Sequence, residues 1–211
     1  MVTAVFFGDS ITAGAGASDP TRRWADLVAA ALDWADAVNA GHSATILQHT
    51  PQRAVATVGA AADQNGRDTY LDRVAAHRPA WVLILYGLND MRLNDPAITV
   101  ERFQADLGEV VDGLVASGVA ARRIVIGSPP HLPAGAYALH PPWDGGGPAL
   151  HARYGAACAA VAASRGARFA DVHRAMADGG GDRLVSPDQI HPNDAGHAVI
   201  AAAFLAAIRA S

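Results

Sequence analysis

Several polar residues that could carry out acyl transfer follow short apolar segments of this sequence. Gly8-Asp9-Ser10 comes directly after an apolar run, and Asp188 precedes His191 by three residues. A serine hydroxyl is a weak nucleophile at neutral pH and needs a base. The imidazole of His191 can accept its proton, while Asp188 can bind the far ring nitrogen and stabilise the imidazolium that forms. The three residue types therefore predict a nucleophile, a base and an orienting acid.

Acyl transfer also needs hydrogen-bond donors, in place beforehand, for the oxygen that becomes negatively charged. The sequence offers three donors beside predicted strand ends: the backbone N–H of Ser10, the backbone N–H of Gly41 and the side-chain amide of Asn89. A glycine suits this role because no side chain blocks the approach of a substrate. We therefore predict an oxyanion hole formed by Ser10, Gly41 and Asn89.

Apolar runs that predict strands alternate with stretches at helical spacing. Strands are predicted over residues 2–7, 35–40, 81–86, 124–128 and 167–172. Helices are predicted over residues 23–32, 99–117 and 150–165, and from Asn193 or Asp194 to about residue 210. The run 81–86 has no polar alternation, which is typical of a central parallel strand buried on both faces. The alternation predicts a three-layer α/β/α sandwich, with the polar residues above at the carboxyl ends of its strands.

Two stretches do not fit this simple repeat. Residues 45–72 are longer than one helix, and residues 129–148 are rich in Pro and Gly. We interpret residues 129–148 as a long loop above the sheet, since long ordered loops in compact domains are often functional. The residues that could contact substrate in or near these stretches are His42, Tyr137, His140 and Trp143. Tyr137 and Trp143 could line an acyl pocket, stack on a sugar ring or only pack within the loop.

Taken together, these segments resemble the four conserved blocks of the SGNH/GDSL hydrolase family (GDSL-like lipases and acylhydrolases). The matching blocks are Gly8-Asp9-Ser10, Gly41, Gly87-Leu88-Asn89-Asp90 and Asp188-Gln189-Ile190-His191-Pro192. They stand in the family's order and cover nearly the whole chain. The resemblance implies a flavodoxin-like, parallel, five-stranded sheet, a single SGNH hydrolase domain over residues 1–211, and a serine esterase with no metal and no cofactor. It also implies Ser10, Gly41, Asn89 and His191 as the signature positions, with Asp188 completing the triad.

The sequence departs from the family's pattern at four places near these blocks. Ala44 stands where many members have a second glycine, three positions after the first. His42 replaces a usually apolar residue, Leu88 a frequent threonine and Gln189 a frequent glycine. No departure removes a catalytic group. The substituted positions line or support the site, so they leave the substrate class open.

Composition limits the remaining function classes. The 211 residues are 51% hydrophobic and 17% charged, with a net charge of −4, which favours a folded domain over disorder. The sequence has no basic stripe of the kind that binds nucleic acid, so we expect no nucleic-acid partner. The single cysteine, Cys158, excludes a fold built on disulfides, and its apolar surroundings predict a buried residue. The sequence contains no run of about 18 apolar residues, so we do not expect an integral membrane protein.

The first residues carry no positively charged, signal-like segment, so we expect a cytoplasmic protein; a secreted protein after removal of its signal would begin in the same way. Oligomeric state is not predictable from these features.

The main hypothesis is hydrolysis of small or short-chain esters, including acetyl esters on carbohydrates, through an acyl-enzyme on Ser10. The same site could transfer the acyl group to another acceptor, or act on lysophospholipids or thioesters. A different class, a metal-dependent phosphoesterase, would use hard ligands from Asp9, Asn89, Asp90, Asp188 and His191, but it would leave Ser10 without a role. A third class is a non-catalytic binding domain on the same scaffold, and the complete triad argues against it.

Overall fold

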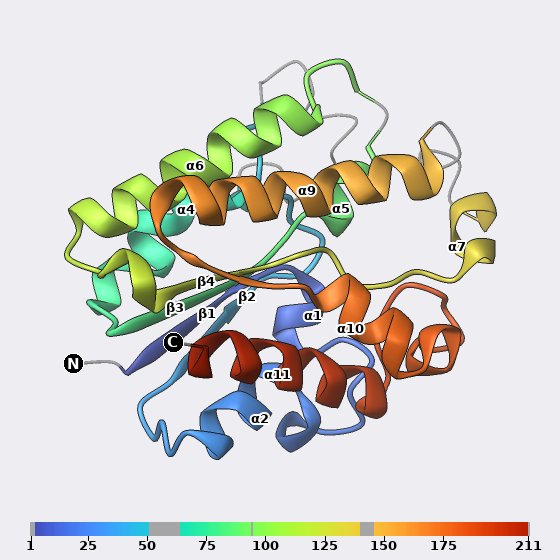
Figure 1. The fold of residues 1–211 in the computed structure, drawn as a ribbon, viewed down its shortest axis with the longest axis horizontal. Coiled ribbons are helices and arrows are strands. Elements are labelled where there is room, and N and C mark those ends of the chain that lie inside the picture. Colours follow the sequence, from blue (N-terminus) through green and yellow to red (C-terminus); the bar gives the residue numbers. More distant parts are fainter. Residues whose placement is uncertain (1–2, 51–63, 94, 140–145, 211) are drawn as a thin grey trace.

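The computed structural model describes residues 3–50, 64–93, 95–139 and 146–210 (Figure 1). Five parallel strands form one sheet in the order β2-β1-β3-β4-β5. The strands are β1 (Ala4–Gly8), β2 (Val38–Gly41), β3 (Trp81–Leu85), β4 (Ile124–Gly127) and β5 (Arg168–Ala170). β1 and β4 are buried along their whole length, and β3 along all but its first residue. This burial explains why their sequences are continuous apolar runs.

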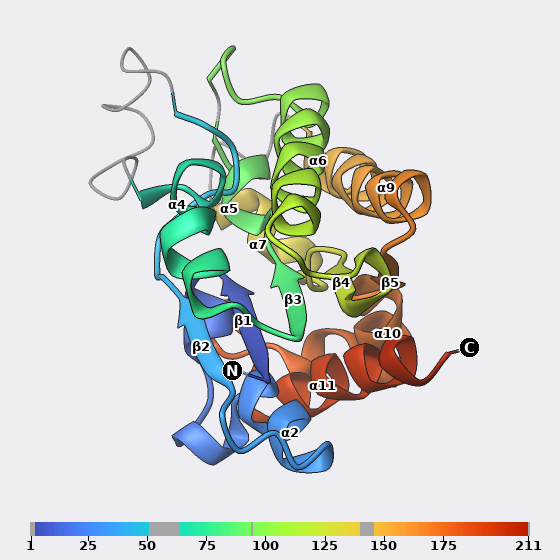
Figure 2. The ribbon, with the colours of Figure 1, turned by 90° about the vertical axis from the view of Figure 1, so that its left-hand side faces the viewer.

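Helices cover both faces of the sheet, as Figures 1 and 2 show. On one face lie α4 (Gly66–Arg73), α6 (Val100–Ala116) and α9 (Gly147–Arg165). On the other lie α2 (Trp24–Ala31), α10 (Val172–Gly179) and α11 (Asp194–Arg209). The three-layer α/β/α sandwich and the flavodoxin-like strand order are therefore confirmed.

Successive residues of β1 supply the cores of the two layers. Phe6 packs edge-on against Trp24 of α2, with ring centroids 5.2 Å apart. Phe7 points to the opposite face, as neighbouring strand residues do, and packs against Tyr86 at 5.1 Å. Trp24 also stacks on Phe204 of α11 at 4.5 Å, which joins the two helices.

Three strands end level with one another at one edge of the sheet. Gly8 at the end of β1 is paired with Gly41 of β2 on one side and with Leu85 of β3 on the other. The order of the strands reverses between β1 and β3. Ligands of open α/β sheets bind beyond the carboxyl ends of the strands at such a reversal. The residues that follow β1, β2 and β3 therefore meet where a site is expected.

Short elements connect the main ones. They are the helices α1 (Ser10–Ala13), α5 (Leu88–Met91) and α7 (Ala134–Leu139), and the 3₁₀ segments Pro20–Arg22, Ala75–His77, Ala121–Arg123 and Gly181–Leu184. No helix in the described ranges is long and apolar enough to cross a bilayer. Cys158 is a free, buried residue of α9, as predicted.

Several predicted boundaries differ from the structure. β2 begins at Val38, three residues later than expected, because a turn with Asp33 at φ +55° precedes it. The predicted strand 167–172 is only three residues long, since Asp171 caps α10 by accepting a hydrogen bond from the Arg174 N–H at 3.1 Å. α10 itself was not predicted. α9 begins at Gly147, with proline in its first turn.

The proposed long loop over residues 129–148 was wrong in part. It contains α7, whose Ala136 N–H donates to the Pro133 carbonyl at 3.0 Å. Residues 140–145 of this stretch lie outside the described ranges.

Candidate active site

Ser10 is the first residue of a helix that begins immediately after β1. The Asp9 carboxylate accepts the Ile11 N–H at 2.9 Å and caps α1. The first N–H groups of a helix have no partner within it, and in the described part of the chain nothing accepts the Ser10 N–H. The hydroxyl and the backbone N–H of Ser10 therefore both lie at the carboxyl edge of the sheet.

A tight turn before α11 carries the other two members of the predicted triad. The Ser10 hydroxyl lies 3.0 Å from His191 Nε2, and His191 Nδ1 lies 2.6 Å from Asp188 Oδ2. The second carboxylate oxygen of Asp188 accepts the N–H groups of Ile190 at 2.9 Å and His191 at 3.0 Å. Ser186 N–H closes the turn on the His191 carbonyl at 2.8 Å. The structure thus brings Ser10, His191 and Asp188 together in the order that the predicted triad requires.

The hydrogen bonds to Asp188 favour its charged form. Burial alone would raise the pKa of this carboxyl, but the bonds from the His191 side chain and from the two backbone N–H groups outweigh burial and lower the pKa. A charged Asp188 keeps the proton of His191 on Nδ1. Nε2 is then the nitrogen that can accept the Ser10 proton.

The loop after α1 packs directly on the turn that carries His191. Gly16 has φ +90°, and a Cβ at this position would lie 2.0 Å from the Pro192 carbonyl oxygen. The buried His197 of α11 lies 3.1 Å from the Ala15 carbonyl through Nε2. Asp194 accepts the backbone N–H of Ser18 at 2.8 Å and its hydroxyl at 2.7 Å.

These contacts fix the separation between the helix of Ser10 and the loop of His191. The sequence does not reveal these contacts, because the partners are more than 170 residues apart and form no local pattern.

Asn89 follows β3 in the short helix α5, and its side chain is only 8% exposed. Its Nδ2 donates to the Thr45 carbonyl at 2.9 Å. A primary amide has two N–H donors, so the second remains for a ligand. This places the Asn89 amide beside the loop that follows β2, as the oxyanion-hole prediction requires.

The structure does not support Gly41 as an oxyanion donor. Its N–H donates to the Asn39 side-chain oxygen at 2.9 Å, and Asn39 Nδ2 in turn donates to the Thr12 carbonyl at 2.7 Å. A Cβ at Gly41 would lie 2.2 Å from the Ala13 nitrogen. The glycine is therefore needed because β2 packs closely against α1, and its N–H is already used.

Ala44, three residues later, has the free donor that Gly41 lacks. It is exposed, and its N–H has no acceptor among the described residues. Its φ is +63°, in the left-handed region that favours glycine. Gln189, within the catalytic turn, has φ +62°. Both residues stand where the family often has glycine, so these two departures from its pattern keep a glycine-like backbone.

Two buried carboxyls beneath the site have structural partners. Asp90 accepts the N–H groups of Leu47 and Gln48 at 3.0 Å, which anchors the loop that carries Ala44 and Thr45. Burial raises the pKa of Asp90 to about 6, although these N–H bonds oppose the rise. Burial likewise raises the pKa of Asp9 to about 7, against the Ile11 N–H bond, and the charge of Asp90 adds to the rise.

The ligand set of the metal hypothesis is not gathered around one point. Asp9 and Asp90 hold backbone N–H groups, and Asp188 holds His191. Within the described ranges, no group of three or more His, Cys, Asp or Glu side chains is arranged to bind a metal ion.

The two predicted substrate contacts that the structure describes lie in different segments of the chain. His42 is exposed, directly after β2. Tyr137 lies in α7, and its hydroxyl is 2.8 Å from His151 Nδ1, in a cavity whose lining does not include Ser10. His140 and Trp143 lie outside the described residues.

Solved structures with similar folds include proteins described as a lipase/acylhydrolase and as an acetylxylan esterase. A lipase/acylhydrolase from Enterococcus faecalis has a TM-score of 0.74 and 22% sequence identity, over 98% of this chain and 94% of that one. The acetylxylan esterase Axe2 from Geobacillus stearothermophilus has a TM-score of 0.71 and 21% identity, over 99% and 94%. A structure named TesA has a TM-score of 0.71 and 20% identity, over 98% of both chains. No curated protein matches the sequence significantly.

Residues 6–199 match the GDSL-like lipase/acylhydrolase family. This range includes Ser10, Asn89, Asp188 and His191, and it spans most of the 211 residues. The chain belongs to the GDSL-like lipase/acylhydrolase family and is a carboxylic ester hydrolase.

Proposed function

We propose that this protein is a serine esterase that works through an acyl-enzyme on Ser10. Ser10 attacks the ester carbonyl carbon as His191 Nε2 takes the hydroxyl proton. The C–O bond to the alcohol breaks, and His191 gives its proton to the leaving oxygen. Water then attacks the acyl-enzyme with the same base and releases the acid. The observation that carries this proposal is the hydrogen-bonded series Ser10–His191–Asp188, with distances of 3.0 and 2.6 Å.

The oxyanion is held by the N–H groups of Ser10 and Ala44 and by the free amide N–H of Asn89. Ala44 takes the place first assigned to Gly41, because the Gly41 N–H is bonded to Asn39. Support comes from the hydrogen bond that Asn89 Nδ2 donates to the carbonyl of Thr45, the residue that follows Ala44.

Amide proton shifts can identify the backbone donors. Reaction of Ser10 with a fluorophosphonate leaves a tetrahedral phosphonyl group whose oxygen occupies the oxyanion position. The amide protons of Ser10 and Ala44 should then shift strongly downfield, because each gains a hydrogen bond to a charged oxygen. The Gly41 amide proton, which keeps its bond to Asn39, is the internal control. A large shift at Gly41 with none at Ala44 would restore the original assignment.

The proposed substrates are small or short-chain esters, including acetyl esters on carbohydrates. Ala44 is exposed and Ser10 is half-buried, so the reacting edge is reachable from solvent. The similar folds include Axe2, which is described as an acetylxylan esterase and an acetyl-xylooligosaccharide esterase, and this likeness supports a carbohydrate ester. Lysophospholipids and thioesters are the second choice, and acyl transfer to another acceptor would use the same acyl-enzyme.

The decisive experiment compares wild type with Ser10→Ala on p-nitrophenyl acetate, butyrate and octanoate, each with and without EDTA. We expect activity that is highest on acetate, unaffected by EDTA and absent in Ser10→Ala. Activity that survives in Ser10→Ala would overturn the acyl-enzyme proposal. Activity lost with EDTA would revive the metal-dependent alternative. Release of p-nitrophenol with transfer to added xylose, detected by mass spectrometry, would identify an acyltransferase.

A further inference from the structure

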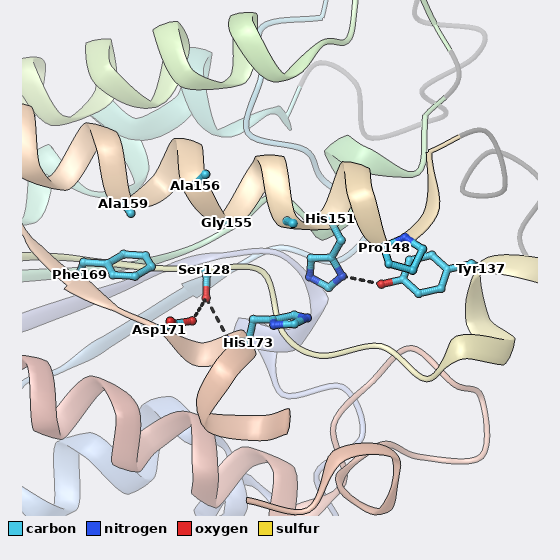
Figure 3. Close-up of a pocket in the computed structure, with 11 residues that line it drawn as sticks. Ser128, Tyr137, Pro148, His151, Gly155, Ala156, Ala159, Phe169, Asp171 and His173 are labelled. Atoms are coloured by element: carbon cyan, nitrogen blue, oxygen red, sulfur yellow. Dashed lines mark hydrogen bonds between the residues drawn. The ribbon is translucent and has the colours of Figure 1, made fainter. Parts of the chain in front are cut away.

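A cavity of about 320 Å³ opens between α9 and the start of α10, beyond the carboxyl ends of β4 and β5 (Figure 3). Its lining includes Ser128, His151, Phe169, Asp171 and His173. None of the lining residues belongs to the proposed triad or oxyanion hole. We call this cavity the α9–α10 groove. It lies in the half of the sheet away from the reversal between β1 and β3, and the proposed mechanism makes no use of it.

The floor of the groove consists of polar groups that already have partners. Ser128 Oγ accepts the His173 N–H at 3.0 Å and donates to Asp171 Oδ1 at 3.4 Å. His151 Nε2 lies 3.2 Å from the Pro129 carbonyl, which can only accept, so Nε2 carries the ring proton. His151 Nδ1 must then accept the Tyr137 hydroxyl at 2.8 Å. These bonds leave the floor rigid and without spare donors.

Two groups in the wall of the groove are open to a ligand. Asp171 uses Oδ1 to cap α10 and to bind Ser128, while Oδ2 accepts nothing from the described residues. The His173 ring contacts the His151 ring edge-on at 4.6 Å, but neither of its nitrogens has a hydrogen bond within the described ranges. Figure 3 shows Asp171 and His173 on the same side of the groove, facing α9. They offer an acceptor and an imidazole that can accept or donate.

The charge of the groove excludes anions. Among the described residues, no arginine lines it. Burial lowers the pKa of His151 to about 4, and burial together with the neighbouring His131 lowers the pKa of His173. Both imidazoles are therefore neutral near pH 7, and the Asp171 carboxylate sets the sign of the local charge. A free carboxylate, such as the acid product of ester hydrolysis, would be repelled.

The opposite wall is apolar and kept open by a glycine. Phe169 closes one end, and Gly155 and Ala156 of α9 are among the lining residues. A Cβ at Gly155 would meet only the Cβ of Ser128, at an ordinary 3.8 Å, so packing does not require glycine. Glycine inside a helix is less stable than alanine. Glycine at this position therefore leaves the groove wider than alanine would, at the expense of helix stability.

We propose that the α9–α10 groove binds one neutral sugar ring. The apolar face of the ring would lie against Phe169 and the α9 wall, and its hydroxyls would donate to Asp171 Oδ2 and bond to His173. The volume lies at the lower end of the roughly 300–1,000 Å³ of small-molecule sites, which suits a single ring. The choice of a sugar rests on the proposed function on carbohydrate esters, but the binding itself needs no reaction at Ser10.

The test is an NMR titration of ¹⁵N-labelled Ser10→Ala protein, which cannot turn over an ester by the proposed mechanism. Methyl β-xylopyranoside should cause saturable shifts at the amides of Gly155, Ala156 and His173, with Kd about 1–10 mM, typical of a weak single-ring ligand. Cyclohexylamine and cyclohexanecarboxylate present a ring of similar size with a positive or a negative head. The carboxylate should not bind. Absence of saturable shifts with the sugar, or saturation by the amine alone, would overturn the proposal.

A matched pair of variants locates the binding. Ala156→Leu fills the groove and should weaken sugar binding at least tenfold. Ala160→Leu adds the same side chain to an exposed position of α9 outside the groove and should leave Kd unchanged. Both variants, with Ser10 intact, should hydrolyse p-nitrophenyl acetate as wild type does. Normal turnover without sugar binding would refute the sugar site alone, whereas sugar binding without turnover in wild type would refute the esterase proposal alone.

Discussion

The Asp188 carboxylate performs two tasks with its two oxygens. Oδ1 holds the turn through the N–H groups of Ile190 and His191, and Oδ2 holds the His191 ring. In Asp188→Asn the amide oxygen can still accept the backbone N–H groups, but an NH₂ group then faces Nδ1. The ring proton of His191 would then move to Nε2, and a protonated Nε2 cannot accept the proton of Ser10. We expect kcat on p-nitrophenyl acetate to fall by about 10³–10⁴ with no change in the melting curve.

A neighbouring aspartate provides the control for this variant. Asp182 also pairs with a histidine, at 2.8 Å from His131 Nε2, but it lies outside the site. Asp182→Asn should change kcat by less than twofold. Equal losses in the two variants would mean that His191 does not depend on Asp188 for its tautomer.

The residues of the proposed triad follow from residue types in order, whereas the proposed oxyanion donor Ala44 does not. Asp188 and His191 are three residues apart, and Gly8-Asp9-Ser10 follows an apolar run, so local sequence carried that information. Gly41 and Ala44 differ in which N–H is already bonded, and that depends on Asn39 reaching both Gly41 and Thr12. We interpreted the glycine at position 41 as an oxyanion donor, whereas its close packing against α1 accounts for its presence.

The left-handed backbone of Ala44 gives a second prediction at the residue scale. An L-residue in this region is disfavoured by roughly 1–2 kcal/mol, and glycine recovers this while losing some chain entropy on folding. Ala44→Gly should therefore raise the free energy of unfolding by about 0.5–1 kcal/mol, measured by urea denaturation. kcat should stay within about threefold of wild type, because the N–H is retained. A destabilised Ala44→Gly protein would contradict the positive φ.

Helix α9 contains a glycine, Gly155, that lowers the stability of the helix. Gly155→Ala should raise the free energy of unfolding by up to about 1 kcal/mol, because alanine is the better helix former and its Cβ has space. Gly196 in α11 is the contrasting case, since a Cβ there would lie 2.2 Å from the Leu184 carbonyl oxygen. Gly196→Ala should lower the free energy of unfolding by about 1–3 kcal/mol. Urea denaturation of both variants measures the difference, and stabilisation of both would contradict the packing.

The long elements were predictable because their apolar periodicity extends over many residues. Residues 99–117 gave α6 nearly to its ends, with Phe103, Leu107 and Val111 on its buried face. The short elements depend on contacts beyond their own sequence. α10 begins where it does because Asp171 caps it, and α7 lies in a stretch whose prolines and glycines suggested a loop. Where the signal covers fewer than about eight residues, tertiary contacts decide the structure.

At the scale of the whole molecule, the loops of the candidate active site are held by two carboxyl groups that become buried when the chain folds. Asp9 is 2% exposed, Asp90 is fully buried, and each holds backbone N–H groups under the loops that carry Ser10 and Ala44. Their buried bonds shape the site, while their desolvation opposes folding when they are charged. The fold therefore supports the site at an energetic cost that depends on pH.

That dependence can be measured with Asp9→Asn. The pKa of Asp9 is about 7 in the folded protein, against 3.8 for an unperturbed carboxyl. Between these values the folded protein keeps a proton that the unfolded chain has released, so the contribution of Asp9 to the free energy of unfolding falls as pH rises from about 4 to 7. Asparagine does not titrate, and its amide oxygen can still accept the Ile11 N–H. The stability of Asp9→Asn relative to wild type should therefore increase by about 2 kcal/mol or more between pH 5 and pH 8.

Urea denaturation at pH 5 and pH 8 measures this increase. Asp36→Asn, at an exposed position, is the control and should differ from wild type equally at both pH values. The sign is the discriminating feature. A carboxyl stabilised in its charged form would make Asp9→Asn progressively worse than wild type as pH rises, and that result would show that Asp9 is held as a charged group beneath the site.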